Sequence, residues 1–172
     1  ADADAEPAQL EIALGPAGQK SAWKLPPPKL LGRSGSQSVD TSAVEAVIIS
    51  PNAPSAMAKY VRECQTLGLR YIYDPSQQIV RLSAEDLAEG IRGSWILIAN
   101  EYEFELIRDK TGLDAEAVLG LTETLIITRG EHGSIIRRRD GVHVIPPVAP
   151  VVEADPTGVG DAYRSGVIFG LL

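Results

Sequence analysis

The sequence predicts an α/β domain in which a mostly parallel sheet lies between two layers of helices. From about residue 43 onward, short apolar runs rich in Val and Ile alternate with amphipathic stretches of helical period. Each run ends in polar or turn-forming residues, as strands do in sheets of this kind. At 172 residues and 44% hydrophobic content, the chain can bury one ordinary core.

The first predicted unit is a buried strand at 47–49 followed by a helix. The turn residues Ser50-Pro51-Asn52 separate the two, and Gly68 closes the helix. Apolar residues at helical spacing are expected to face the core: Met57, Tyr60, Val61, Cys64 and Leu67.

Two further strands are predicted at 69–73 and 95–99, because both are apolar runs bounded by polar residues. A helix follows each strand. Residues 83–86 have the spacing of a capping box that opens the first helix, and residues 100–103 open the second. A third, shorter helix is expected near 114–119.

A fourth strand is expected at 125–127, and a β-hairpin follows it. Segments 134–138 and 142–145 form the hairpin around the turn signal Asp140-Gly141. Strands that alternate with helices predict right-handed crossovers and a three-layer α/β/α arrangement.

Residues 1–38 are predicted to be an irregular segment. They are rich in Ala, Pro, Gly, Gln and Ser, and they contain Pro26-Pro27-Pro28. Only residues 10–14 alternate like a short strand, which Gly15-Pro16 ends at once.

Composition argues against several classes of partner and site. A net charge of −7 gives no basic surface for nucleic acid or for an anionic membrane. Cys64 is the only cysteine, so no intrachain disulfide forms, and with His132 and His143 it makes no usual zinc site. With only short apolar runs and no N-terminal secretion signal, the sequence predicts a soluble, cytoplasmic protein.

The chemically most informative segment is the run from Asp155 to Asp161, which precedes an apolar helix. Gly158 and Gly160 let the backbone approach a ligand closely, and the N–H groups of Gly158, Val159 and Gly160 would face an anion at the helix N-terminus. A carboxylate repels phosphate, so Asp161 makes sense as a base that takes the proton of an attacking hydroxyl. The alternative is an ordinary Asp-Pro-Thr-Gly turn before a helix.

Other polar residues at strand ends are expected at the same edge of the sheet. Asn100 and Glu103 share one helix face and would orient water around Mg²⁺ that bridges nucleotide phosphates. From the local sequence alone, a plain helix cap is the favoured interpretation of this pair. Thr128 and Gly130 would line the nucleotide's phosphates or ribose, and Asp74 ends its strand in a turn that borders the same crevice.

In this order and spacing, the motifs resemble those of the ribokinase-like sugar and nucleoside kinases, the phosphofructokinase B family. Residues 155–163 are similar to the family's C-terminal signature, in which the last aspartate is the catalytic base and the glycine-rich turn is the anion hole. Residues 100–103 look like its Asn-x-x-Glu motif for magnesium and phosphate. Residues 128–133 look like its nucleotide-binding segment, which includes Gly133.

The resemblance implies an incomplete ribokinase-like kinase domain at 39–172, with a sheet that is cut at both ends. It implies ATP and Mg²⁺ as cofactors. It also implies a monovalent cation such as K⁺ beneath the anion hole, with the Asp155 side chain and the Thr157 carbonyl as ligands. The family's substrate-binding N-terminal half has no counterpart in this sequence, so the chain is expected to be a fragment that can be inactive by itself.

The form of the signature resembles that of bacterial adenosine kinases more than that of ribokinase. Pro156 and Val159 stand where threonine and alanine are usual, and Asp-Ala-Tyr-Arg ends at Arg164. The expected function is therefore transfer of the γ-phosphate of ATP to a hydroxymethyl group of a nucleoside such as adenosine. Ribose, fructose or another sugar is the alternative substrate, and a nucleotide-binding module without catalysis is the alternative function. A homodimer of the full-length parent remains open.

Overall fold

The computed structural model describes residues 11–14, 21–24, 44–148 and 158–171. Within these ranges the strands form one eight-stranded sheet in the order β2-β1-β3-β4-β5-β6-β7-β8. Its four central strands are parallel: β3 (Val47–Ile49), β4 (Tyr71–Tyr73), β5 (Ile96–Asn100) and β6 (Thr124–Thr128). Two antiparallel hairpins flank them: β1 (Glu11–Leu14) with β2 (Ser21–Lys24), and β7 (Ser134–Arg138) with β8 (Gly141–Ile145).

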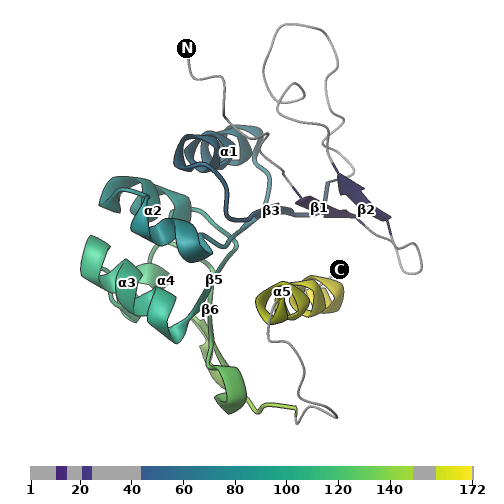
Figure 1. Ribbon diagram of the computed structural model, residues 1–172, viewed down its shortest axis with the longest axis vertical. Coiled ribbons are helices and arrows are strands. Elements are labelled where there is room, and N and C mark those ends of the chain that lie inside the picture. Colours follow the sequence, from purple (N-terminus) through teal and green to yellow (C-terminus); the bar gives the residue numbers. More distant parts are fainter. Residues whose placement is uncertain (1–10, 15–20, 25–43, 149–157, 172) are drawn as a thin grey trace, which may run out of the picture.

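Helices cover the two faces of the sheet unequally, as Figure 1 shows. Four helices pack on one face, whereas α5 (Val159–Leu171) lies on the opposite face. The four are α1 (Pro54–Leu67), α2 (Ala84–Ile91), α3 (Glu101–Thr111) and α4 (Ala115–Leu119). Two short 3₁₀ turns complete the connections, η3 (Ser76–Val80) before α2 and η4 (Gly130–His132) before β7. None of the helices in these ranges is long and apolar enough to cross a bilayer.

Two hydrophobic clusters form because successive strand residues point to opposite faces of the sheet. Toward α1–α4, the cluster includes Tyr71, Tyr73 and Leu97 together with Met57 and Leu87 from the helices. Toward α5, the buried members are all isoleucines, and Tyr163, Val167 and Ile168 of α5 pack on them: Ile48, Ile72, Ile96, Ile98 and Ile126. The predicted three-layer α/β/α arrangement is therefore confirmed.

The predicted helix ends are also confirmed. Gly68 has a φ of 65° and donates to the carbonyls of Cys64 and Gln65, which ends α1. Ser83 caps α2 by accepting from the N–H of Asp86.

Two details differ from the sequence predictions. Residues 21–24 form a strand, although only 10–14 was expected to do so within the first 38 residues. Antiparallel pairing with β1 stabilises this strand, and the four-residue sequence pattern is too short to indicate it. Leu67 was expected on the buried face of α1, but 49% of it is exposed, because it is the last residue of that helix.

Candidate functional site

The carboxyl ends of the parallel strands bring the predicted polar residues to one edge of the sheet. Asn100 ends β5 and pairs in register with Thr128, which ends β6. Asp74 directly follows β4, and its N–H donates to the carbonyl of Ile49 at the end of β3. Parallel pairing thus places these strand ends side by side, as predicted.

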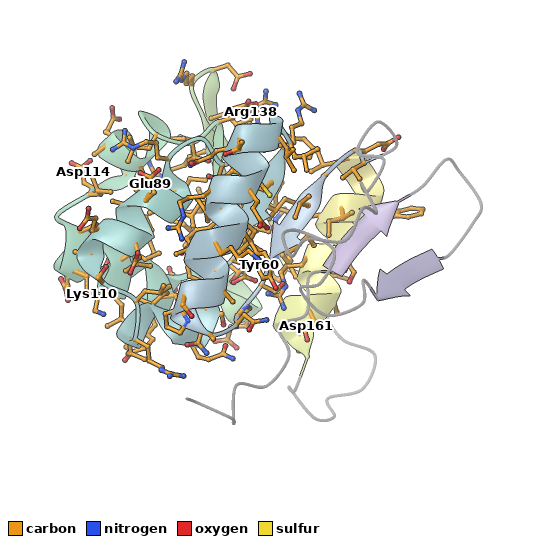
Figure 2. All side chains as sticks on the ribbon, turned by 90° about the horizontal axis from the view of Figure 1, so that it is seen from above. Tyr60, Glu89, Lys110, Asp114, Arg138 and Asp161 are labelled. Atoms are coloured by element: carbon orange, nitrogen blue, oxygen red, sulfur yellow. The ribbon has the colours of Figure 1, made fainter. Side chains whose placement is uncertain are left out.

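The first turn of α5 carries Asp161. Gly158 has a φ of 82°, which favours glycine, and its carbonyl accepts from the N–H of Ala162 at 2.9 Å. The helix begins at Val159, and Figure 2 shows Asp161 near its start. The Asp161 side chain is 74% exposed, so its carboxylate is open to an incoming group.

Arg164 fixes this turn to the sheet edge. Its guanidinium donates to the carboxylate of Asp74 and also forms an ion pair with Asp161, three residues earlier on the same helix. A buried carboxylate is costly unless it is paired, and Arg164 supplies the partner for Asp74. The two carboxylates are therefore joined through one cation.

A second contact holds α5 further along the sheet. The hydroxyl of Tyr163 donates to the buried hydroxyl of Ser134 at 2.8 Å, and Ser134 is the residue of β7 that pairs with Thr128. Together, Arg164 and Tyr163 link α5 to the end of β4 and to the start of β7. Because β5 and β6 lie between these strands, the first turn of α5 lies at the edge where Asn100 and Thr128 end their strands.

Asn100 and Glu103 form the capping box of α3. Asn100 Oδ1 accepts from the N–H of Glu103 at 2.7 Å, and Glu103 Oε2 accepts from the N–H of Asn100 at 2.9 Å. Ser76 Oγ donates to the other carboxylate oxygen, Glu103 Oε1, at 3.1 Å. Each oxygen can accept a further bond from water, so the pair fits the oxygen-ligand chemistry of hydrated Mg²⁺ while it caps the helix.

The segment after β6 forms a tight loop. The N–H of Arg129 donates to the carbonyl of Gly133 at 2.8 Å, around the η4 turn. Gly130 and Gly133 have positive φ values of 54° and 80°. A Cβ added at Gly133 would lie 2.0 Å from the carbonyl oxygen of Ile145, so the backbone there leaves no room for a side chain.

Two predicted site residues, Asp155 and Thr157, lie outside the described ranges, as does the start of the signature. Inside those ranges, no group of three or more His, Cys, Asp and Glu side chains is arranged to hold a metal ion directly.

Three contributors to this edge were missed as functional residues. Arg164 follows Asp161 by three residues in the same helix, and this spacing is the local signal that was available; no local signal links Tyr163 to Ser134, 29 residues away. Ser76 lies in the turn after β4, and nothing in the local sequence indicates that it bonds to Glu103, 27 residues away.

Cys64 is a core residue, as predicted. It is buried in α1, and burial, with a smaller contribution from Glu63, raises the pKa of its thiol to about 12. The thiol is thus kept protonated, away from the sheet edge.

The sequence is similar to those of known kinases. Residues 22–172 match the profile described as pfkB family carbohydrate kinase. The chain is 34% identical over 96 residues to a nucleoside kinase from Methanocaldococcus jannaschii, covering 56% of this chain and 32% of the relative. It is 32% identical over 112 residues to a nucleoside kinase from Thermoplasma acidophilum, covering 65% of this chain and 37% of the relative.

Solved structures of a nucleoside kinase are also similar to this chain. A nucleoside kinase from Burkholderia thailandensis, in complex with inosine, superimposes with a TM-score of 0.74 at 35% identity, covering 77% of this chain and 43% of that one. The same kinase has also been solved in complex with ADP-inosine. The chain spans about a third of the length of the first curated relatives and less than half of this structural neighbour.

Proposed function

Because this chain belongs to the pfkB family of carbohydrate kinases, we propose that it carries the phosphoryl-transfer site of an ATP-dependent kinase. The proposed reaction moves the γ-phosphate of ATP to a hydroxymethyl group of a nucleoside. The observation that carries the proposal is the anchoring of Asp161 at the sheet edge, through Arg164 to Asp74.

Asp161 is the proposed general base. Its carboxylate accepts the proton of the substrate hydroxyl as the hydroxyl oxygen bonds to the γ-phosphorus and the bond to the β-phosphate oxygen breaks, which releases ADP. The exposure of its side chain supports this role, since a base must reach its substrate. The N–H groups of Gly158, Val159 and Gly160, at the start of α5, are proposed to stabilise charge on the transferring phosphate.

The strand ends beside α5 are proposed to hold the nucleotide. Magnesium, when bound, neutralises charge on the nucleotide phosphates. Asn100 and Glu103 would hold its water ligands, and the glycine loop at Gly130 and Gly133 together with Thr128 would bind the nucleotide.

Asp155 and Thr157 are proposed ligands of a monovalent cation such as K⁺ beneath the anion hole. This proposal rests on the resemblance of residues 155–163 to the family signature, and its test is the dependence of turnover on K⁺. Replacement of Asp155 with Asn should raise the K⁺ concentration needed for half-maximal activity.

A nucleoside is the proposed acceptor, with adenosine and inosine as the first candidates. Two relatives at 32% identity or more are nucleoside kinases, and the structural neighbour at 35% identity was solved with inosine. Ribose and fructose are the competing acceptors, because the family profile is that of carbohydrate kinases.

The test, made on full-length protein, is transfer of ³²P from γ-labelled ATP to adenosine, inosine, ribose or fructose in the presence of Mg²⁺ and K⁺. Nucleoside 5′-monophosphate is the expected product, and Asp161→Asn should lower kcat by about a thousandfold or more, since general-base contributions reach ~10²–10⁴-fold. Near-unchanged turnover in this variant would remove the role of base. ATP binding without transfer to any alcohol would instead show a nucleotide-binding module.

A further inference from the structure

The turn that follows β4 carries two side chains that each hold a different part of the proposed site. Asp74 binds Arg164, which in turn binds the proposed base Asp161. Two residues later, Ser76 Oγ donates to Glu103 Oε1, on the proposed magnesium side. The same three-residue turn is therefore linked to the proposed base through Arg164 and directly to the proposed metal-binding carboxylate.

Exposure rises along the chain of contacts that leads to the base. The Asp74 side chain is 7% exposed, that of Arg164 is 15% exposed and that of Asp161 is 74% exposed. The buried Asp74 carboxylate thus fixes the mostly buried guanidinium of Arg164. The other terminal nitrogen of that guanidinium contacts the exposed carboxylate of Asp161. Because Arg is planar with fixed donor directions, this fixes the direction as well as the distance of the contact.

The contact to Glu103 also fixes orientation. Ser76 Oγ holds Oε1, and the N–H of Asn100 holds Oε2 at 2.9 Å, so both oxygens are bound. Ser76 has a φ of 40°, a left-handed conformation that is strained for a non-glycine residue. Its hydroxyl is the group that contacts Glu103.

The turn is itself firmly held. The N–H of Asp74 donates to Ile49 at 3.0 Å, and Pro75 is buried. At the far end of η3, Lys110 of α3 donates to three carbonyls, those of Ile79, Val80 and Leu82. Helix α3 is therefore hydrogen-bonded to the connection after β4 at both of its ends, through Glu103 and through Lys110.

We propose that the Asp74-Pro75-Ser76 turn positions both halves of the phosphoryl-transfer site, with Asp74 and Arg164 as positioning residues for Asp161 and Ser76 as the positioning residue for Glu103. The proposal rests on the function proposed above. It assigns two distinguishable effects to residues of one turn: Asp74 acts on the chemical step, and Ser76 acts on the requirement for magnesium.

The first test compares Asp74→Asn, Arg164→Gln and Arg164→Lys. The first two should lower kcat by ten- to a hundredfold, with the KM values for ATP and nucleoside within about threefold, since misplacement by 1 Å costs about 10²-fold. Arg164→Lys keeps the charge and should recover part of the loss. The double variant Asp74→Asn/Arg164→Gln should be no worse than Arg164→Gln alone, because both changes break one path to Asp161.

Arg108→Gln is the matched control, since Arg108 forms a similar ion pair with Glu105, three residues earlier on α3 and outside the site. Its kcat should equal that of the unmodified chain. Equal kcat values in Asp74→Asn and Arg108→Gln, or losses that simply multiply in the double variant, would overturn the role of Asp74.

The second test uses Ser76→Ala and Ser76→Gly, which both lack the hydroxyl. Each should raise the Mg²⁺ concentration for half-maximal rate severalfold, and neither should add to the effect of Glu103→Gln. Glycine relieves the positive φ, so Ser76→Gly should unfold at higher urea concentration than Ser76→Ala. An unchanged Mg²⁺ requirement in both variants would refute the role of Ser76, and a changed requirement in only one would assign it to backbone strain.

NMR of the arginine side chains tests the positioning proposal without measuring turnover, and so separates it from the proposed kinase function. In ¹⁵N-arginine-labelled protein, the guanidinium signals of Arg164 should be dispersed and slow to exchange, and Asp74→Asn should collapse them while Arg108→Gln does not. If Arg164 behaves so but the unmodified chain transfers no phosphate, the proposed function fails and the anchoring holds. If the chain transfers phosphate and Asp74→Asn changes neither the signals nor kcat, the positioning proposal fails.

Discussion

The hydroxyl of Tyr163 donates to the hydroxyl of Ser134 at 2.8 Å, which joins the first turns of α5 to the first residue of β7. Ser134 is completely buried. Together with the contact between Arg164 and Asp74, this bond sets where along the sheet the helix of Asp161 is docked, while the isoleucine cluster beneath it supplies non-directional packing.

Replacement of Tyr163 with Phe should destabilise the fold by about 1 kcal/mol, because the buried Ser134 hydroxyl loses its donor while the ring remains. Urea unfolding measures the loss. Tyr102→Phe is the control, since Tyr102 is 71% exposed and its change should cost close to nothing. Equal unfolding midpoints for the two variants would contradict the assigned bond.

Gly133→Ala should be strongly destabilising. The added Cβ would lie 2.0 Å from the carbonyl oxygen of Ile145, and the φ of 80° adds strain. The loop after β6 would have to separate from the end of β8, so both the unfolding free energy and the affinity for ATP should fall.

Gly130→Ala is the comparison that isolates the overlap. Gly130 also has a positive φ, but no atom lies within 4 Å of its Cβ position. The unfolding free energy of Gly130→Ala should fall only by the cost of backbone strain, roughly 1–2 kcal/mol. A greater loss of stability for Gly130→Ala than for Gly133→Ala would show that the close approach to Ile145 is wrong.

The fold should weaken at high pH. Burial raises the pKa of Cys64 from 9.0 to about 12 and that of Tyr71 from 10.0 to about 12, so the unfolded state loses these protons first. The stability that these groups contribute is complete below about pH 9 and is lost as the pH rises toward 12. Between the two pKa values of each group, the unfolding free energy should fall by about 1.4 kcal/mol per pH unit.

Urea titrations at pH 8, 9 and 10 test this expectation. Cys64→Ala should be less stable at pH 8, because it leaves a cavity, but its stability should fall less between pH 9 and 10. If the unfolding free energies of the unmodified chain and of Cys64→Ala fall equally between pH 9 and 10, the thiol is not the titrating group.

Local sequence patterns predicted the elements whose signals are local. The apolar runs at 47–49 and 125–127 lie within strands, and the glycine at 68 ends its helix. Parallel pairing then placed Asn100 beside Thr128, because strands of one direction present their ends at one edge.

What escaped prediction depends on distant partners. Strand β2 exists through pairing with β1, and the four residues Ser21–Lys24 carry too short a pattern to signal it. Asp74 looked like an ordinary strand-ending turn, because its partner Arg164 lies 90 residues later in the chain. For Asn100 and Glu103, the cap and the magnesium role use the same geometry, so sequence alone left both open.

The separation between Asp74 and Arg164 has a kinetic consequence. Closing a loop of 90 residues costs roughly 4 kcal/mol of chain entropy by (3/2)RT ln n, which one ion pair does not offset. The contact therefore forms only once the strands between them have aligned and given α5 a surface to dock on. The proposed base Asp161, which contacts Arg164, therefore reaches its position at the sheet edge only after these strands have aligned.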